Sequence, residues 1–379
     1  MAVHGLVRYG ILGCGMMGQE HIRNIQLLDN AEVTVLADPN IQMRTLAHQL
    51  VPTARIVDGI DALLNSDDID ALVIATPNYQ HVEQLLTLIE CLSSAGQPLP
   101  ILIEKPICTR LEEVSLLLDA ANNYDAPIWV AMEYRYMPPV SQLLSLIRQG
   151  EIGRGHLFSI REHRFPFLEK VNDWNRFNRK TGGTLVEKCC HFFDLMRLMT
   201  EANAVRVYAS GSQAVNHLDE TYDGETPDIL DNAFVTVEFD NGARANLELC
   251  MFAEGATYQE EISAIGDQGK VECLVPGPDR FWPKETLGNA PVAKVISSPR
   301  FPKGPRSVEV PVDPTLLEAG DHNGSTFYQH QKFQCAIWGE QTVEVSLVDG
   351  LKAVVIGLAA QASIKEKRVI ALKENGLLF

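Results

Sequence analysis

The stretch LVRYGILGCGMMG, residues 6–18, decides the fold of the first part of the chain. Its apolar half predicts a buried strand, and its second half has the spacing G-x-G-x-x-G at the start of a predicted helix. Glycines at this spacing permit a tight turn, a close approach of the backbone to a pyrophosphate, and packing of the helix on the sheet. The predicted cofactor loop consists of Gly13, Cys14, Gly15, Met16, Met17 and Gly18.

A second strand, predicted over residues 31–37, ends at Asp38. Asp38 lies about 20 residues after Gly18, where dinucleotide-binding folds place the acid that binds the adenosine ribose hydroxyls. A carboxylate there also repels a ribose 2′-phosphate, and no basic residue follows closely before Arg44. The sequence therefore favours NAD over NADP as the cofactor.

Apolar strands continue to alternate with amphipathic helices up to residue 132. Strands are predicted at 71–75, 99–103 and 128–132, and helices at about 79–93 and 111–122. This alternation is typical of an α/β fold and predicts a Rossmann-type, doubly wound parallel sheet over residues 1–132. Between the first of these strands and the helix that follows it lies the turn Ala75-Thr76-Pro77-Asn78. His81 comes near the start of that helix, where a helix-end hydrogen bond is a simpler role than catalysis.

The strand in LPILIEKP, residues 99–106, stops abruptly at Glu104, Lys105 and Pro106. Ligands of open α/β sheets bind beyond the carboxyl ends of the strands, so Lys105 would face that crevice, where partial burial can lower a lysine pKa towards neutrality. Pro106 stops the strand from continuing. The plainer alternative is a strand-end turn with a solvated charge pair, and this segment alone does not decide between the two.

The composition and charge of the sequence argue against several classes of protein. The formal net charge of -17 argues against a nucleic-acid-binding surface or an anionic membrane as partner. No apolar run approaches the roughly 20 residues of a membrane span, and residues 1–9 lack the pattern of a signal peptide. The eight cysteines have no paired spacing of the zinc or redox type. We therefore expect a cytoplasmic, reduced protein without a metal.

From residue 133 to 379 the pattern changes to that of an α+β domain. Short strands joined by hairpin turns such as Asp240-Asn241-Gly242 predict an open, mostly antiparallel sheet with a few helices. Six strands are predicted in sequence, at 156–162, 204–210, 232–239, 243–251, 260–265 and 269–274, and a last one at 368–372. The proline-rich residues at about 276–314 predict an extended excursion between strands rather than a third domain.

The segment TGGTLVEKCCHFFD, residues 181–194, carries the second group of chemical candidates. Glycines lead into a predicted helix on which Glu187 and His191 lie at i and i+4, hence on one face. Asp194, three residues further, could hold the imidazole. An acid and a histidine that are partly desolvated suit proton transfer near neutral pH, although an ordinary amphipathic helix with an exposed salt bridge fits the same pattern.

Together these motifs resemble the Gfo/Idh/MocA family of nicotinamide-dependent oxidoreductases. The matching segments are the glycine loop, residues 75–78 with His81, residues 104–106, Arg135 before an aromatic residue and a proline, residues 151–153, Trp174, residues 182–194 and residues 348–363. The resemblance implies a Rossmann domain followed by an open antiparallel sheet, with the active site between, and it assigns Lys105 and His191 as catalytic. Glu187 stands where the family usually carries aspartate, and Cys189 where glycine is common.

The resemblance also implies the chemistry: hydride transfer between NAD and a secondary alcohol of a sugar or polyol of inositol-like polarity. The implied catalytic residues are Lys105, His191 and Glu187. The implied cofactor contacts are the glycine loop, Asp38, Ala75, Thr76, Pro77, Asn78, His81, Glu104 and Lys105. The substrate candidates are Arg135, Trp174, Arg179, Lys180, His191, His322 and Tyr328.

Some alternatives stay open at this point. The family includes glycosidases that retain NAD and non-catalytic nucleotide sensors that act through partners. The basic residues Arg161, Arg164, Arg176, Arg179 and Lys180 could bind an anionic substrate group, or they could form an ordinary solvated cluster. A homodimer or homotetramer through the C-terminal sheet is also expected.

Overall fold

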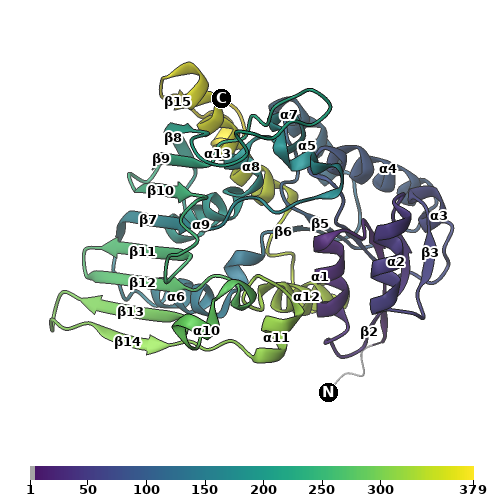
Figure 1. The fold of residues 1–379 in the computed structure, drawn as a ribbon, viewed down its shortest axis with the longest axis horizontal. Coiled ribbons are helices and arrows are strands. Elements are labelled where there is room, and N and C mark those ends of the chain that lie inside the picture. Colours follow the sequence, from purple (N-terminus) through teal and green to yellow (C-terminus); the bar gives the residue numbers. More distant parts are fainter. Residues whose placement is uncertain (1–4) are drawn as a thin grey trace. The chain divides into compact units, whose positions relative to one another are not determined.

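The structure is a computed structural model that describes residues 5–379. Its contacts divide the chain into two compact units (Figure 1). The first unit comprises the described residues up to Glu133 together with Lys170–Trp174 and Thr326–Leu351. The second comprises Tyr134–Glu169, Asn175–Ser325 and Lys352–Phe379.

The first unit contains a six-stranded sheet in the order β3-β2-β1-β4-β5-β6. Its strands are β1 Val7–Leu12, β2 Ala31–Ala37, β3 Arg55–Val57, β4 Ala71–Ile74, β5 Ile101–Glu104 and β6 Ile128–Ala131. Every neighbouring pair is parallel, which confirms the predicted Rossmann sheet. The strand order reverses between β1 and β4, the switch point at which ligands of such sheets bind.

Helices connect these strands, and one helix joins them from far along the chain. The connecting helices are α1 Met16–Ile25, α2 Ile41–Leu50, α3 Ile60–Leu64, α4 His81–Ser94 and α5 Val114–Asn122. Helix α12, Ser325–Ile337, places Phe333 against Tyr9 and Trp129, with ring centroids 6.5 and 6.2 Å away. The sequence did not predict β3 and α3, because three and five residues are too short to show a periodic pattern.

The second unit contains a nine-stranded sheet in the order β14-β13-β12-β11-β7-β10-β9-β8-β15 (Figure 1). Its strands are β7 Gly155–His163, β8 Ala204–Ser212, β9 Asn232–Phe239, β10 Arg244–Cys250, β11 Glu260–Gly266, β12 Gly269–Val275, β13 Lys294–Pro299, β14 Arg306–Glu309 and β15 Ile370–Ala371. Of the neighbouring strands described in this nine-stranded sheet, only β7 and β10 pair in parallel. The predicted open, mostly antiparallel sheet is confirmed.

The proline-rich segment contributes more to this sheet than its sequence indicated. Strands β13 and β14 lie within residues 276–314 and extend one edge of the sheet. Prolines are tolerated in edge strands and at strand ends, which is where Pro299 closes β13. All four residues of β14 are exposed, so the segment lacks the buried alternation that would have identified a strand.

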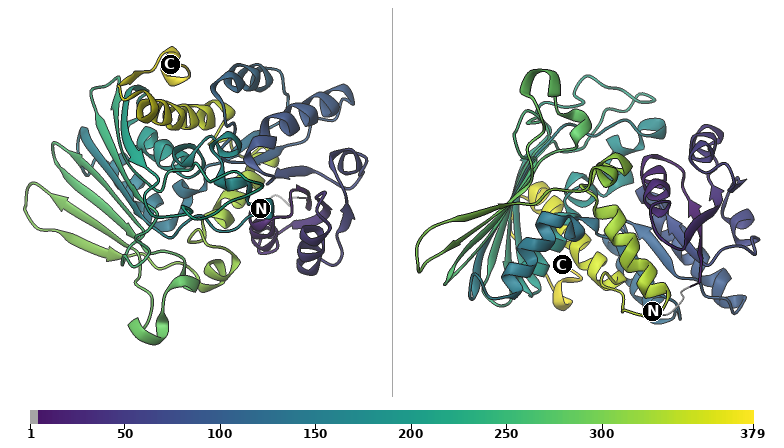
Figure 2. Two further views of the ribbon diagram at one scale, coloured as in Figure 1. Left: turned by 45° about the horizontal axis from the view of Figure 1, so that its top comes forward. Right: turned by 90° about the horizontal axis from the view of Figure 1, so that it is seen from below.

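Helices α6 Pro138–Arg148 and α9 Cys190–Thr200 pack on one face of the sheet of the second unit (Figure 2). The other helices with residues in this unit are α7 Asn178–Thr181, α8 Thr184–Glu187, α10 Lys284–Leu287, α11 Pro314–Ala319 and α13 Leu347–Glu366, the last of which belongs to it from Lys352 onwards. The predicted continuous helix before Asp194 is wrong, because α8 ends at Glu187 and α9 begins at Cys190. On the opposite face Tyr208 and Phe234 remain 49% and 63% exposed.

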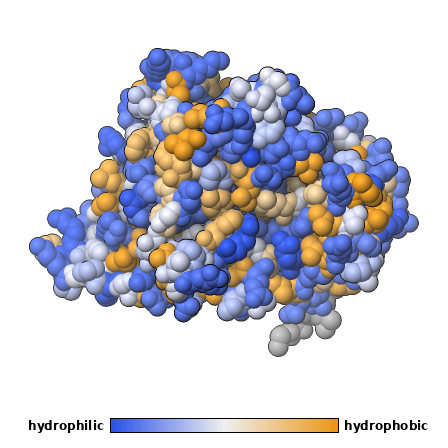
Figure 3. Space-filling view, viewed as in Figure 1, coloured by the Kyte–Doolittle hydropathy of each residue, from blue (hydrophilic) through white to orange (hydrophobic). Residues whose placement is uncertain are grey.

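Hydrophilic residues (blue) predominate on the face of the protein shown in Figure 3, with hydrophobic groups scattered among them. Among the described helices, α13 alone has the length and apolarity of a membrane span. Its most apolar window is 61% buried inside the protein, as expected for a core helix.

Candidate active site

In the glycine loop between β1 and α1, Gly13 and Gly18 pack closely against the backbone, whereas Gly15 faces open space. A Cβ at Gly13, where φ is +98°, would come within 2.6 Å of the Ala75 backbone. A Cβ at Gly18 would come within 2.0 Å of the Gly13 carbonyl oxygen. At Gly15 a Cβ would meet nothing within 4 Å, and no side chain caps α1 there. The loop therefore presents the amino end of a helix to open space, as phosphate-binding loops do.

Asp38 lies at the carboxyl end of β2 and is joined to this loop. Its Oδ2 accepts a hydrogen bond from the Cys14 N–H at 2.8 Å, and its Oδ1 accepts one from the Asn40 N–H at 2.7 Å. Arg44 donates from Nη1 to the Asp38 carbonyl oxygen at 2.9 Å. A pocket of about 380 Å³ adjoins Arg44 and is lined also by Ile56, Val57, Asp58 and Ala62. An open glycine loop, a carboxylate at the end of β2 and an adjoining pocket together fit a dinucleotide of the NAD type.

His81 links the loops that follow β4 and β5. Its Nδ1 lies 2.8 Å from the Pro106 carbonyl oxygen and its Nε2 lies 2.9 Å from the Thr76 carbonyl oxygen. Burial lowers the pKa of His81, and these two contacts oppose that shift because only a doubly protonated ring can donate to both carbonyls. The ring therefore fixes the two strand-end loops to each other.

Glu104 and Lys105 lie at the carboxyl end of β5, on the same sheet edge as the glycine loop. Lys105 is half-buried, and the Lys105–Pro106 peptide bond is cis. Glu104 is only 3% exposed; its Oε2 accepts from the Lys105 N–H at 3.1 Å, and its Oε1 lies 3.0 Å from Nε2 of His21. The Glu104 carboxylate is thus engaged with neighbouring protein groups.

The second unit holds His191 in an aromatic stack. His191 lies on α9, is 2% exposed, and stacks on Tyr134 with ring centroids 4.1 Å apart and planes 5° apart. Lys188 donates a hydrogen bond from Nζ to the Tyr134 hydroxyl. The ring of His322 lies 6.0 Å from that of Tyr134. Tyr134 therefore connects the candidate base to a buried lysine.

That lysine belongs to a cluster of buried charges. Nζ of Lys188 lies 2.9 Å from Oε1 of Glu162, and Glu162 and Glu260 are directly opposite each other on β7 and β11. Burial lowers the pKa of Lys188, and a neighbouring Arg164 lowers it further, whereas Glu162 opposes the shift. Burial, assisted by the charge of Glu162, raises the pKa of Glu260 to about 7. Two inward carboxylates close together favour retention of one proton.

Arg135 and Asp194 form an ion pair in the second unit. Nε and Nη2 of Arg135 donate to the two Asp194 oxygens at 2.8 and 2.6 Å, and both side chains are buried. The prediction that Asp194 holds the His191 imidazole is therefore wrong, because its carboxylate is taken by a guanidinium that can bind it at two points. The guanidinium of Arg135, a substrate candidate, is correspondingly engaged by Asp194. Glu187 is 8% exposed and lies at the end of α8.

The remaining substrate candidates occupy varied places. Trp174 is 8% exposed and lies in the first unit, with its ring 6.2 Å from Tyr79. Tyr328 lies on α12 of that unit beside Phe327. In the basic stretch each arginine has a carboxylate partner: Arg161 pairs with Glu261, Arg164 with Glu162, Arg176 with Glu220 and Arg179 with Glu225. Arg179 and Lys180 also lie over the Phe177 ring. This pairing favours the plainer interpretation of the basic stretch.

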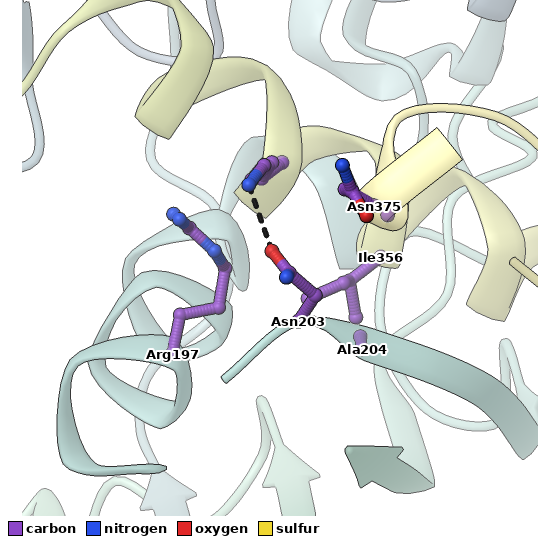
Figure 4. A pocket seen from close by; sticks show the side chains of 7 residues that line it. Arg197, Asn203, Ala204, Ile356 and Asn375 are labelled. Carbon is purple, nitrogen blue, oxygen red and sulfur yellow. Dashed lines mark hydrogen bonds between the residues drawn. The ribbon is translucent and has the colours of Figure 1, made fainter. Parts of the chain in front are cut away.

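A separate small pocket, with no room for a water molecule, lies near the carboxyl end of α9 (Figure 4). It is lined by Arg197, Asn203, Ala204, Lys352, Ile356, Asn375 and Gly376, and Lys352 donates to Asn203 Oδ1 at 2.7 Å. It contains none of the candidate residues. Ligand pockets typically enclose roughly 300–1,000 Å³, so a pocket too tight for water is not assigned to the substrate.

Family models match both parts of the chain. Residues 7–132 match the NAD-binding Rossmann fold of the GFO_IDH_MocA oxidoreductase family, and residues 145–372 match the C-terminal alpha/beta domain of that family. The chain belongs to the Gfo/Idh/MocA family of oxidoreductases.

The chain is also similar to proteins named as oxidoreductases or dehydrogenases, and to solved structures of the same fold. The chain is 28% identical to the uncharacterized oxidoreductase YrbE of Bacillus subtilis over 69% of its length and 71% of that protein. It is 23% identical to the myo-inositol 2-dehydrogenase of Thermotoga maritima over 97% and 99% of the two chains. A levoglucosan dehydrogenase solved in complex with NADH shares the fold, with a TM-score of 0.78, 21% identity, and coverage of 97% of this chain and 99% of that one.

Several residues around the family's candidate positions were not predicted from the sequence. They are Tyr134, Lys188, Glu162 and Glu260 in the second unit, and His21 and His330 in the first. A signal for the two glutamates was present, because Glu162 continues the buried alternation of Phe158 and Ile160 along β7. A charged residue at an inward position of a strand indicates a buried polar cluster.

The raised pKa of Glu260 predicts a falling stability between about pH 4.5 and 7. The unfolded chain releases this proton near the ordinary value of 4.5 and the folded chain only near 7, so folding retains a proton in this interval and loses stability as the pH rises. Glu260→Gln, which imitates the protonated acid, is expected to flatten this part of the curve by up to about 3 kcal/mol. Urea denaturation at several pH values measures the difference.

Glu261→Gln is the matched control for this measurement. Glu261 is the next residue on β11 and pairs with Arg161, with a third of its side chain exposed. The Glu261→Gln variant should still lose stability between pH 4.5 and 7 as the wild type does. A wild-type slope retained by Glu260→Gln would show that Glu260 does not hold the proton.

Proposed function

We propose that this protein is an NAD-dependent dehydrogenase that acts on a secondary alcohol of a sugar or polyol. The observation that carries the proposal is the common sheet edge of the first unit, where an open glycine loop, Asp38 and Lys105 lie at the carboxyl ends of β1, β2 and β5. The proposal is supported by relatives named as inositol 2-dehydrogenases, such as that of Rhizobium meliloti, 27% identical over 266 residues.

In the proposed reaction each of these residues would have a separate role. NAD, when bound, supplies the acceptor for the hydride that leaves the alcohol carbon. His191 takes the hydroxyl proton as the carbonyl forms, and Lys105 donates a hydrogen bond to the same oxygen, on which negative charge develops. Glu187, which is buried, would orient or tune this pair. The glycine loop and Asp38 bind and orient the cofactor.

A substrate panel tests the proposal. Inositols, aldoses and sugar acids are each offered with NAD and with NADP, and nicotinamide absorbance is followed. Oxidation of at least one polyol or sugar with NAD is expected. Tight NAD binding without turnover of any of them would contradict a dehydrogenase. Release of an aryl leaving group from aryl-glycosides without accumulation of NADH would instead identify a glycosidase that retains its cofactor.

Asp38 is proposed to set the preference for NAD. Its carboxylate would repel a 2′-phosphate, and Arg44, the nearest following base, already donates to the Asp38 and Val57 carbonyl oxygens. Asp38→Asn keeps the shape of the side chain and removes its charge. We expect the ratio of kcat/KM with NADP to that with NAD to rise about tenfold, the effect of about 1.4 kcal/mol. Arg44→Ala should not raise this ratio, and an equal rise in both variants would contradict a role for the Asp38 charge.

A further inference from the structure

A chain of three buried side chains leads away from Lys105 in the first unit. Glu104 Oε1 lies 3.0 Å from Nε2 of His21, and Nδ1 of His21 lies 2.8 Å from Nε2 of His330. The three residues come from β5, α1 and α12, and their exposures are 3%, 0% and 0%. His330 thus reaches Glu104 from a helix more than 200 residues later in the sequence.

The hydrogen-bond acceptors show which ring nitrogens of His21 and His330 carry protons. An ionised carboxylate only accepts, so Nε2 of His21 carries a proton and donates to Glu104. If His21 is neutral, its Nδ1 then has a lone pair, and His330 must donate to it from Nε2. Burial lowers the pKa of His330 well below its ordinary value, and His21 adds to that shift, which favours a neutral His330. No described residue hydrogen-bonds to Nδ1 of His330.

Several titratable groups surround these side chains. Glu104 and Lys105 both lie close enough to His81 to act on its pKa, which the charge of Glu104 raises and that of Lys105 lowers. On α1, Glu20 precedes His21 and accepts from the Thr326 hydroxyl at 2.8 Å. The buried ring of Tyr9 on β1 meets His330 edge-on, with centroids 6.0 Å apart. Among these groups, only the two imidazoles form the chain to Glu104.

We propose that His330 is a positioning residue for Lys105: through His21 it holds the Glu104 carboxylate ionised and in place against the Lys105 backbone N–H. The inference rests on the proposed function, in which Lys105 donates to the reacting oxygen. A carboxylate that accepts one hydrogen bond from His21 and one from the Lys105 backbone N–H is doubly fixed. Hydrogen bonds to the ionised form favour that form, and a nearby anion favours a protonated lysine.

Three substitutions at position 330 separate this role from space-filling. His330→Gln retains an N–H donor at the ε position, where the structure has the contact to His21. His330→Asn retains the same amide one carbon shorter, and His330→Leu retains the bulk without a donor. Glu104→Gln removes the anion itself. In each cofactor-free protein, the Lys105 pKa is measured by NMR of ¹³C-methylated lysines, with the Lys105→Arg variant assigning the signal.

The expected result is a graded series. Glu104→Gln should lower the Lys105 pKa by about 1 unit or more, as loss of an adjacent opposite charge does. His330→Leu and His330→Asn should lower the Lys105 pKa by a smaller amount, about 0.5 unit. In His330→Gln the Lys105 pKa should match that of the wild type. In the wild type, ¹⁵N NMR of the histidine rings should show a proton on Nε2 of His330 and none on Nδ1 of His21.

The outcomes separate this inference from the proposed function. An unchanged Lys105 pKa in His330→Leu, beside a lowered one in Glu104→Gln, would show that His330 only fills space. If the position-330 variants do not fold, the wild-type histidine spectrum still decides, because an unprotonated Nε2 on His330 overturns the proposal. None of these measurements needs turnover. A substrate panel without turnover would therefore contradict the proposed dehydrogenase activity, but it would not contradict the proposed effect of His330 on Lys105.

Discussion

A His191→Asn enzyme should turn over about 10²–10⁴-fold more slowly than the wild type, the usual contribution of general acid–base catalysis. Asparagine is smaller than histidine, but its planar amide takes the place of the Nδ1 side of the imidazole against the Tyr134 ring, on which His191 stacks at 4.1 Å. It cannot take up a proton at neutral pH. The loss should therefore appear in kcat, with the affinity for NAD unchanged, since the glycine loop and Asp38 belong to the other unit. Single-turnover absorbance and equilibrium titration with NAD measure the two quantities separately.

His156→Asn provides the matched control. His156 lies in the same unit, on β7, and is exposed. Its replacement should change turnover by less than about twofold, because surface substitutions rarely matter. Turnover of His191→Asn within tenfold of the wild type would remove His191 from the proton-transfer step. Tyr134, whose hydroxyl is bonded to Lys188, would then be the next group to test in the same stack.

The first unit was predictable because its determinants are local. The glycine spacing, the apolar strands and the acid at the end of β2 are each readable within a few residues, and parallel strands fix which ends meet at one edge. Lys105 could thus be placed at the carboxyl end of β5 beside the glycine loop. His330 could not, because its approach to His21 depends on the docking of α12, which no local pattern specifies.

Around His191, too, the local structure was predicted from the sequence but the long-range contacts were not. The helix that carries His191 was predicted, but its partners are set by tertiary packing across long sequence separations: Tyr134 lies 54 residues from Lys188. Asp194 was expected to reach back to His191 one helical turn away. Arg135, 59 residues away, binds it instead at two points, and a charge-assisted pair of that kind outweighs a single bond to an imidazole.

The edge of the second sheet was missed for a different reason. Prolines around β13 and β14 suggested an irregular excursion, yet β13 pairs with both β12 and β14, and β14, at the edge, needs only one row of ladder hydrogen bonds. The central strands were predicted because they alternate between buried and exposed residues, as in β9 and β10. Edge strands lack that alternation when both of their faces are exposed.

Lys105→Met is the second substitution from which we expect a large effect. Methionine keeps the length and apolar stem of the side chain but loses the ammonium donor. Removal of one donor to a developing oxyanion typically costs about 10²–10³ in kcat, and we expect a loss of that size at saturating NAD. The Glu104 carboxylate accepts from the Lys105 backbone N–H and not only from side chains, so its place should survive the substitution. Steady-state kinetics with a substrate identified by the panel measures the loss.

Two further variants determine what the lost turnover means. Lys332→Met, on the exposed side of α12 where Lys332 pairs with Glu344, should leave kcat unchanged and controls for loss of one positive charge. Lys105→Arg keeps the charge but presents it on a planar, more extended donor, so it should recover only part of the rate. Full recovery by arginine would mean that charge alone acts at this position. If Lys105→Met retains more than a tenth of the wild-type kcat, the oxygen is stabilised by another group.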